Sequence, residues 1–260
     1  MLLLTSRDNP NIKNVVKLKK NARFRKQTGS FIAEGLRVCV DAMLSNAQIE
    51  ALFVTNQALE KYAEQIDKLA SYSVKSFTLA PELFELISDT ETPQGVLCVI
   101  KTLDKTLQFG KINNGGKYLA LDNVQDPSNL GTILRSAEAF GISGIILSSD
   151  CCDIYSPKVV RGSMGAIFRL PFMVCDSIRA FLEDNPQLDS YAAVVDSSAD
   201  KITELSFCDS CVAIIGNEGN GIKKETLEAC SHRFTIPMAG NAESLNASVA
   251  ASIIIWEMIK

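Results

Sequence analysis

Two short apolar runs near the C-terminus are each followed at once by a loop of small and polar residues. The first run, residues 212–215, is unbroken and suits a strand buried in a parallel sheet. A glycine-rich turn at 216–221 follows it, while the second run, 234–238, precedes the loop 239–245 and a predicted helix at 246–258. Loops that follow parallel strands meet at one edge of the sheet. The sequence therefore predicts an α/β domain with a ligand site at that edge.

Short strands and helices alternate strictly through the C-terminal half of the chain. Each strand is a short apolar run, and each helix carries apolar residues at helical spacing. This alternation predicts a parallel sheet covered by helices on both faces. Strands are predicted at 118–122, 144–148, 169–174, 191–196 and 211–215, and helices at 128–140, 156–166, 177–183 and 222–230.

The N-terminal half repeats this alternation on a smaller scale, which predicts a second α/β domain. The stretch 103–117 is rich in glycine, asparagine and lysine and is typical of a linker. We therefore predict one domain at 1–102, a linker at 103–117 and a second domain at 118–260. In the first domain, strands are predicted at 31–33, 49–55, 74–78 and 94–101, and helices at 9–26, 35–44, 56–69 and 81–87.

The positive charge of the chain is concentrated at its N-terminal end. The net charge is −4, yet residues 1–37 contain nine Lys or Arg and only two Asp or Glu. A basic segment on an acidic body favours contact with nucleic-acid phosphates over a merely solvated helix face. We predict RNA contacts here at Lys19, Arg23 and Arg25.

No apolar run is long enough to cross a membrane, and the run at residues 1–4 is too short for a signal-peptide core. We therefore expect a cytoplasmic protein with no membrane partner.

A possible zinc site consists of Cys208, Cys211, Cys230 and His232, because four such ligands can hold that metal. Cys211 opens a buried strand, however, and a buried cysteine acts as a small hydrophobic residue. We therefore predict that the chain binds no metal.

Three motifs of the C-terminal half occur in the order that one family uses. They are LDNVQDPSNLGTILRSAEAFG at 121–141, IIGNEGNGI at 214–222 and FTIPMAGNAESLNASVAAS at 234–252. Together they resemble the SpoU family of RNA ribose 2′-O-methyltransferases, within the SPOUT superfamily. That resemblance implies a C-terminal α/β trefoil knot. On FIAEG at 31–35 and TPQGV at 92–96, the first half resembles an L30e-like substrate-binding domain.

The resemblance also implies which residues form the site. It assigns catalysis to Asn129, Arg135, Glu218, Ser244 and Asn246. It assigns binding of S-adenosylmethionine to Gly216, Asn217, Gly219, Ile236, Met238 and Leu245. Lys158 and Arg161, in SPKVVRGSMGA, also resemble family residues, and they either contact RNA or begin a solvated helix.

Residues taken alone permit other interpretations. Arg135 could be a surface residue paired with Glu138, three positions along the same helix. The glycine-rich turn superficially resembles a dinucleotide fingerprint, although its spacing is reversed and it comes late in its domain. Ser244 and Asn246 could simply cap a helix.

The function implied is methyl transfer from S-adenosylmethionine to a ribose 2′-hydroxyl of RNA, with ribosomal RNA favoured. The alternatives are a tRNA 2′-O-methyltransferase and a non-catalytic RNA-binding or ribosome-assembly factor. The family implies a homodimer formed through the knot domain. The small residues Ala247, Ala250 and Ala251 would permit a close helix contact there.

Overall fold

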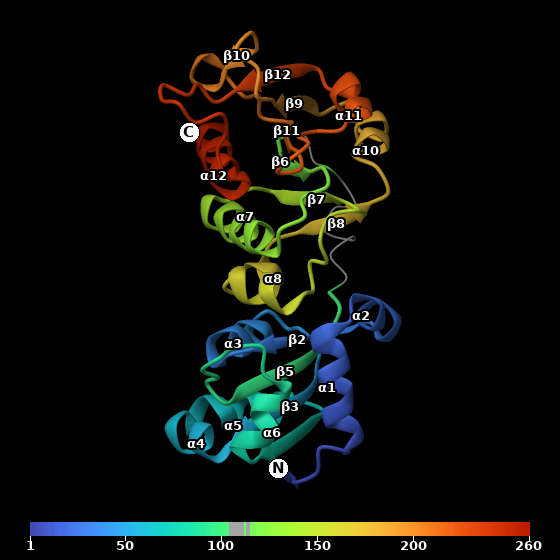
Figure 1. The fold of residues 1–260 in the computed structure, drawn as a ribbon, viewed down its shortest axis with the longest axis vertical. Helices are drawn as coiled ribbons and strands as arrows, with labels where there is room; N and C mark the ends of the chain where they lie inside the picture. The colour runs from blue at the N-terminus through green and yellow to red at the C-terminus, as the bar shows by residue number, and fades with distance from the viewer. Residues whose placement is uncertain (104–111, 113–114) are drawn as a thin grey trace. The chain divides into compact units, whose positions relative to one another are not determined.

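The computed structural model describes residues 1–103, 112 and 115–260, which divide into two compact units (Figure 1). The first unit contains residues 1–103 and 153–168, and the second contains residues 104–152 and 169–260. Most of the predicted linker, at 104–111 and 113–114, lies outside the described residues.

Among its described residues, the first unit holds a five-stranded sheet in the order β1-β4-β3-β5-β2. Strands β1, β4 and β3 run parallel, and β5 is antiparallel to both of its neighbours. The strands are β1 (Leu2–Leu4), β2 (Ser30–Glu34), β3 (Ile49–Thr55), β4 (Lys75–Leu79) and β5 (Val96–Lys101).

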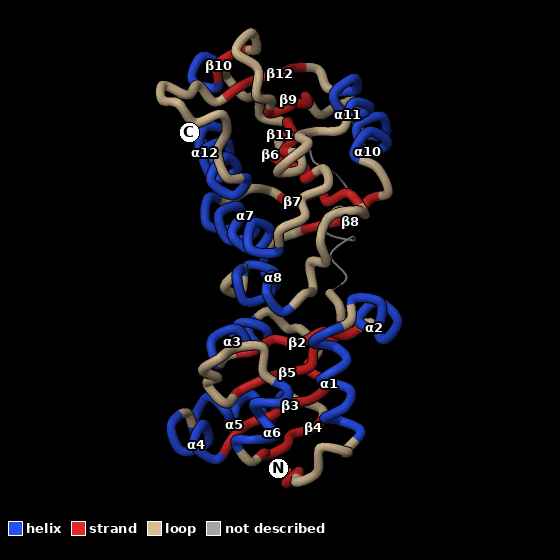
Figure 2. The backbone as a smooth tube through the Cα atoms, viewed as in Figure 1, coloured by secondary structure: helices blue, strands red, loops and turns tan. Residues whose placement is uncertain are grey.

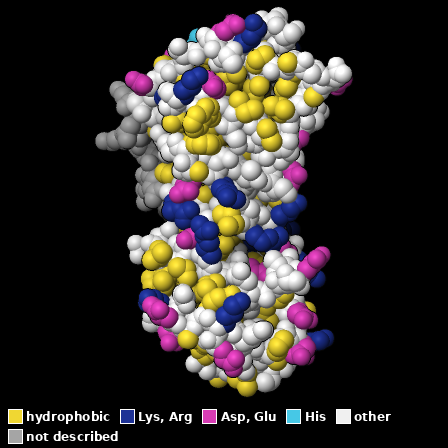
Figure 3. Space-filling model, turned by 90° about the vertical axis from the view of Figure 1, so that its left-hand side faces the viewer, with side chains coloured by type: hydrophobic (Ala, Val, Ile, Leu, Met, Phe, Trp, Pro, Cys, Tyr) yellow, Lys and Arg dark blue, Asp and Glu magenta, His cyan; other side chains and the backbone are white. Residues whose placement is uncertain are grey.

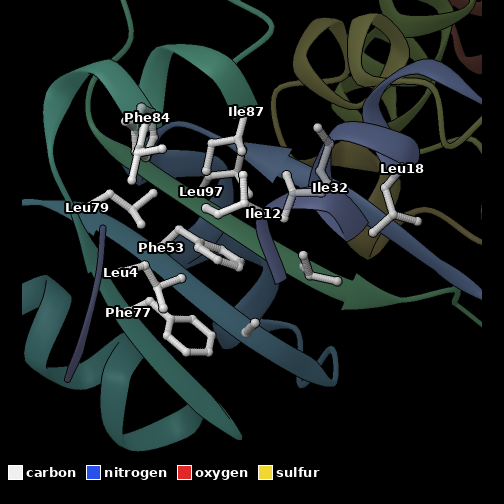
Figure 4. Packing of buried hydrophobic residues seen from close by; sticks show 14 residues of the cluster. Leu4, Ile12, Leu18, Ile32, Phe53, Phe77, Leu79, Phe84, Ile87 and Leu97 are labelled. Atoms are coloured by element: carbon white, nitrogen blue, oxygen red, sulfur yellow. The ribbon is translucent and has the colours of Figure 1, made fainter. Parts of the chain in front are cut away.

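Helices cover both faces of this first sheet. The helices are α1 (Pro10–Lys20), α2 (Ala22–Thr28), α3 (Leu36–Leu44), α4 (Asn56–Lys61), α5 (Ala63–Tyr72), α6 (Pro81–Ile87) and α8 (Pro157–Gly162). On one face, Ile12 and Leu18 of α1 and Phe84 of α6 pack with Phe53 and Leu97 of the sheet (Figure 4). On the other face lie α3 and α5.

The predicted helix 9–26 is wrong as a single helix, because it breaks at Asn21. Asn21 has an extended backbone, with φ −129° and ψ 107°, and its side chain accepts a hydrogen bond from the N–H of Phe24. Asparagine competes well for such capping positions, so one helix ends and the next begins there. A similar break at Tyr62 separates α4 from α5.

The second unit holds a seven-stranded sheet in the order β10-β12-β9-β11-β6-β7-β8, and every pairing among its described strands is parallel. This confirms the predicted parallel sheet. The strands are β6 (Lys117–Leu121), β7 (Gly144–Ser148), β8 (Phe172–Cys175), β9 (Asp189–Ala193), β10 (Asp200–Lys201), β11 (Cys211–Ile215) and β12 (His232–Thr235).

Among the described residues of this unit, four helices cover the two faces of the sheet. They are α7 (Pro127–Phe140), α10 (Ile178–Asp184), α11 (Lys224–Ala229) and α12 (Ala247–Ile259). Figures 1 and 2 show α7 and α12 side by side on one face and α10 and α11 on the other. Ile178 and Phe181 of α10 pack with Ile146, Val212 and Ile214 of the sheet.

Four predicted strands of this unit have different bounds. The strands predicted at 118–122 and 191–196 lie at Lys117–Leu121 and Asp189–Ala193. The strand predicted at 169–174 begins only at Phe172, because the short helix α9 (Ala166–Arg169) occupies its first residue and Pro171 follows. The strand predicted at 234–238 ends at Thr235, two residues before Pro237, which has no N–H to donate.

The described residues include no helix that is long and apolar enough to span a bilayer.

Candidate active site

The carboxyl edge of the second sheet gathers loops from distant parts of the sequence. Because β6, β7 and β11 are parallel neighbours, the loops that follow them lie together. The N–H of Asp122, just after β6, still donates to the carbonyl of Ile215 at the end of β11, at 2.8 Å. The start of α7 and the turn after β11 are therefore held against each other.

Three of the predicted site residues form one hydrogen-bonded chain at this edge. The Nδ2 of Asn129 donates to Oε1 of Glu218 at 2.9 Å, although the two residues are 89 positions apart. The Nδ2 of Asn246 donates in turn to Oδ1 of Asn129, also at 2.9 Å. The structure thus joins α7, the glycine-rich turn and the start of α12 through their side chains.

The Glu218 carboxylate accepts further hydrogen bonds at the start of α7. The backbone N–H groups of Gln125 and Asp126 each donate to it at 3.2 Å. Burial opposes ionisation of this carboxyl, but the bonds from Asn129 and these N–H groups outweigh it and lower the pKa of Glu218. Glu218 is therefore an anion at neutral pH, and its lowered pKa makes it a weaker proton acceptor, which suits a positioning role.

Asn217 organises the glycine-rich turn itself. Its Oδ1 accepts from the N–H groups of Gly219 and Asn220 at 3.0 Å, and its Nδ2 donates to the carbonyl of Asn123 at 3.0 Å. A Cβ on Gly216 would lie 2.1–2.3 Å from backbone atoms of the residues that close the turn, so only glycine fits there. The side chain of Asn217 therefore uses its amide to hold the turn together. Its predicted contact with the methyl donor stays a prediction.

The sequence interpretation missed an ionic network that clamps the end of the same turn. The N–H of Lys223 donates to Oδ2 of the fully buried Asp122 at 3.1 Å. The Nζ of Lys223 lies 3.5 Å from Oδ1 of Asp122, which makes no hydrogen bond, and 2.7 Å from Oδ2 of Asp150. Its bond to Asp150 raises the pKa of Lys223. The sequence signal that could have pointed to Asp122 is a carboxylate at the end of a short apolar run.

Asn246 both caps α12 and reaches the site. Its Oδ1 accepts from the N–H and the hydroxyl of Ser248, at 2.9 and 2.7 Å. Capping therefore does not compete with the contact to Asn129. Ser244 lies exposed in the loop before α12, and its hydroxyl makes no recorded hydrogen bond within the described chain. Leu245 and Ile236 are half-buried, and Met238 is exposed.

Arg135 lies on the exposed face of α7 and, in the part of the chain described, has no recorded ion pair. Glu138, the partner in its alternative interpretation, instead binds Arg169, with Nε of Arg169 2.7 Å from Oε1 of Glu138. The predicted pairing of Arg135 with Glu138 is therefore wrong, although Arg135 does lie on the surface. The structure does not join Arg135 to the Glu218–Asn129–Asn246 chain by a hydrogen bond.

The predicted RNA-binding cations differ widely in exposure. Arg25 is only 5% exposed, and its Nη2 lies 2.6 Å from Oδ2 of Asp153, so its predicted RNA contact is not supported. Lys19 donates to the carbonyls of Leu86 and Ser88, and burial lowers its pKa. Arg161 binds Asp89 at 2.9 Å. By contrast, Arg23 and Lys158 are exposed.

The candidate zinc ligands do not converge. Within the described ranges, no group of three or more His, Cys, Asp or Glu side chains is placed to hold a metal ion. The thiol of Cys230 donates to the carbonyl of Thr226, and the ring of His232 stacks on Tyr191 at 4.6 Å. Burial raises the pKa of Cys211 to about 12, so this thiol stays protonated.

Comparison with known proteins gives two family matches and several similar chains. Residues 116–256 match the SpoU rRNA Methylase family, and residues 9–98 match the MRM3-like substrate binding domain. An uncharacterised tRNA/rRNA methyltransferase of Synechocystis is 33% identical over 257 residues, covering 98% of this chain and 92% of that protein.

Two further relatives carry more specific descriptions. The 23S rRNA (guanosine(2553)-2′-O)-methyltransferase RlmP of Bacillus subtilis is 27% identical, covering 99% of each chain. The crystal structure of an AdoMet-bound rRNA methyltransferase from Sinorhizobium meliloti superposes with a TM-score of 0.85 at 29% identity, covering 98% of this chain and 96% of that one.

Proposed function

The chain belongs to the SpoU rRNA methylase family, and we propose that it transfers a methyl group from S-adenosylmethionine to a ribose 2′-hydroxyl of ribosomal RNA. The observation that carries this proposal is the hydrogen-bonded chain of Glu218, Asn129 and Asn246. It brings one polar residue from each of the three family motifs to a single edge of the sheet.

S-adenosylmethionine supplies the methyl group as a sulfonium, so the transfer needs no metal. The loops after β11 and β12 suit it, because they offer backbone N–H and C=O groups beside the half-buried Ile236 and Leu245. Apolar walls with a few fixed polar groups are typical of cofactor sites. We assign the donor to Gly216, Gly219, Ile236, Met238 and Leu245.

In the transfer, the ribose 2′-oxygen forms a bond to the methyl carbon. The bond from that carbon to sulfur breaks, its electron pair goes to sulfur, and the hydroxyl proton passes to solvent water. Catalysis of this kind depends on proximity and on charge that is already in place. Glu218 holds Asn129 at the start of α7, and Asn129 aligns Asn246 with the loop that contains Ser244.

We assign Arg135 to the RNA. Its guanidinium is planar and positively charged, and it can hold a phosphate through two parallel hydrogen bonds. A positively charged guanidinium is a poor proton acceptor. Its role is therefore to position the nucleotide and to stabilise the charge that develops on the 2′-oxygen.

Ribosomal RNA is favoured because the relative from Bacillus subtilis is named for that substrate and covers the whole chain. The N-terminal match to a substrate-binding domain supports the same class. A tRNA substrate and a non-catalytic role in ribosome assembly are the alternatives. Binding of S-adenosylmethionine separates the non-catalytic role from both enzymes.

The test is methyl transfer from labelled S-adenosylmethionine to unmodified ribosomal RNA and, in parallel, to unmodified tRNA. A 2′-O-methyl group blocks alkaline cleavage of the next phosphodiester bond. We expect the label in alkali-resistant dinucleotides of ribosomal RNA. Label in mononucleotides would mean that a base is methylated. Label in tRNA alone would mean that tRNA, and not ribosomal RNA, is the substrate.

We also propose that the second unit forms a homodimer through α12. The predicted small-residue contact is corrected by the structure, because Ala247 and Ala251 are buried within the chain itself. The exposed side of α12 instead carries Val249, Trp256 and Ile259, which are 48%, 56% and 40% exposed. Figure 3 shows hydrophobic side chains gathered on the face of the second unit where α12 lies. Such a patch is typical of a subunit interface.

Val249→Asp is expected to convert this dimer to a monomer, because charged residues are excluded from the centre of such interfaces. Light scattering after gel filtration should show an apparent dissociation constant raised by at least about tenfold, in line with the loss of a central contact. Val195→Asp is the matched control, since Val195 is 77% exposed and lies outside α12. If the two variants have equal masses, α12 is not part of the dimer interface.

Family membership and the parallel sheet support two further parts of the proposal. The C-terminal segment is threaded into the trefoil knot of the family. An experimental backbone trace that shows no threading between residues 211 and 260 would disprove this.

The protein acts in the cytoplasm, and recovery in the membrane fraction after cell breakage would argue against that location.

A further inference from the structure

A cavity of about 410 Å³ lies in the first unit, at the sheet edge where β3 and β4 end and β5 begins. It is lined by residues of α4, of α6 and of the loop before β5. Its size is within the range of sites that take small molecules or parts of larger ligands. The hydrogen-bonded residues Glu218, Asn129 and Asn246 belong to the other unit, so this cavity is not the candidate active site.

The lining suits a flat, largely apolar ring. Ala58 and Phe84, which are fully buried, contribute to its lining, together with the half-buried ring of Tyr62. Pro81 and Pro93 add rigid apolar surface. An aromatic ring beside proline surfaces offers a stacking partner to a planar heterocycle.

The charges at the cavity do not favour a phosphate. Lys61 and Glu85 both line it, so their charges offset each other. The Nζ of Lys61 also lies 5.1 Å from the ring centroid of Tyr62, where it makes a cation–π contact. A neutral ligand therefore fits better than an anion.

Two side-chain amides give the cavity hydrogen-bonding capacity. Oε1 of Gln94 accepts from the N–H of Leu36 at 3.1 Å, which fixes the orientation of that amide. No bond of its Nε2 is recorded in the described part of the chain, so this donor is available to a ligand. Gln57 contributes a second, exposed amide. A flat, neutral ring with donors and acceptors on its edge describes a nucleobase.

The wall that includes Pro93 and Gln94 is held in place by the protein itself. The Glu34 carboxylate accepts from the hydroxyls of Ser88 and Thr90, at 2.5 and 2.6 Å, and from the N–H of Asp89 at 2.7 Å. At the end of this loop, Gly95 has φ +76°, and a Cβ there would lie 2.3 Å from Oγ1 of Thr55. The cavity is therefore formed before a ligand arrives, which lowers the entropic cost of binding.

We propose that this cavity binds one unpaired base of the RNA substrate, separate from the nucleotide that is methylated. The inference rests on the proposed function for its ligand class. The base stacks on Tyr62, and the amides of Gln94 and Gln57 bind its edge. A base held here fixes the register of the RNA without adding a phosphate contact.

Tyr62→Leu tests the proposal, because it keeps apolar bulk and removes the stacking ring. The probe is an unmodified ribosomal RNA transcript, with its dissociation constant measured over a range of salt concentrations. We expect binding to weaken by about tenfold, as for loss of one stacked base. The salt slope should not change, since no phosphate contact is lost. The KM for RNA should rise while kcat and the dissociation constant of S-adenosylmethionine stay unchanged.

Tyr72→Leu is the matched control, because Tyr72 ends α5, is 39% exposed and does not line the cavity. Gln57→Ala, at an exposed position that does not threaten folding, should weaken RNA binding in the same direction by about threefold, as for one hydrogen bond. The proposal is overturned if Tyr62→Leu and Tyr72→Leu bind RNA within twofold of each other. It is also overturned if Tyr62→Leu flattens the salt slope.

The proposed function can fail separately from this inference. If the unaltered protein binds the transcript but transfers no methyl group, the proposed function is wrong. The difference between Tyr62→Leu and Tyr72→Leu still decides whether the cavity holds a base.

Discussion

Arg135→Lys is expected to reduce methyl transfer by roughly two orders of magnitude or more, comparable to loss of a preorganised oxyanion donor. Lysine keeps the charge but lacks the planar fork that grips a phosphate through two bonds. Binding of S-adenosylmethionine should hardly change, because the donor is assigned to the loops after β11 and β12. Stability should stay within about 0.5 kcal/mol, as for an exposed residue with no ion pair recorded among the described residues.

The measurement is transfer of labelled methyl to unmodified ribosomal RNA, beside calorimetric titration of S-adenosylmethionine. Arg179→Lys is the matched control, since Arg179 is an exposed helical arginine that binds Glu183 on its own helix. Transfer by Arg135→Lys at the level of the control would make Arg135 an ordinary surface residue. Loss of S-adenosylmethionine binding would instead mean that Arg135 belongs to the cofactor site.

Glu218→Gln is expected to reduce methyl transfer on the order of a hundredfold, the cost of a misplaced reacting geometry. The carboxylate accepts from Asn129 and from the N–H groups of Gln125 and Asp126. A glutamine offers only one acceptor oxygen and turns an NH₂ group toward donors. Asn129 and the start of α7 therefore lose their fixed position relative to the glycine-rich turn.

The stability lost in Glu218→Gln should depend on pH with a definite sign. The pKa of Glu218 is lower in the folded protein than its ordinary value, despite burial, because its hydrogen bonds favour the charged form. Its contribution is therefore complete above the pKa of the unfolded chain, about 4.3, and is lost as the pH falls through the lower folded value. The melting difference from the unaltered protein should be largest near neutral pH and shrink in acid.

Glu228→Gln is the control for Glu218→Gln, because Glu228 is a surface carboxylate on α11 that only pairs loosely with Lys224, at 3.8 Å. A melting difference for Glu218→Gln that does not change with pH would contradict the assigned ionisation. Normal transfer by Glu218→Gln would remove the residue from the site.

Short, mostly apolar runs and a proline in a first helical turn made several elements predictable to the residue. The strands at 49–55, 144–148 and 211–215 and the helix at 81–87 have the predicted bounds. Strand β1 was missed, because its three residues form a strand only by pairing with β4, from Leu2 beside Phe77 onward. Pairing over such a distance leaves no local pattern in the sequence.

In the site, too, residues that belong to a local sequence motif could be predicted, whereas contacts between residues far apart in the sequence could not. The residues of the three family motifs could be named, and the structure brings Asn129, Glu218 and Asn246 together. The clamp of Lys223 on Asp122 and Asp150 could not be predicted, because it joins loops from three strands. The burial of Arg25 depends likewise on Asp153, 128 positions away, so its charge alone suggested a surface role.

The central claim is that this chain methylates a ribose 2′-hydroxyl of ribosomal RNA, and mapping 2′-O-methyl sites in cellular RNA tests it most directly. Total RNA would be mapped from cells with the gene, without it, and without it but complemented by either the unaltered gene or the Arg135→Lys variant. We expect at least one ribosomal RNA position to lose its 2′-O-methyl group without the gene. The unaltered gene should restore it, and Arg135→Lys should not. Identical maps with and without the gene would contradict the claim.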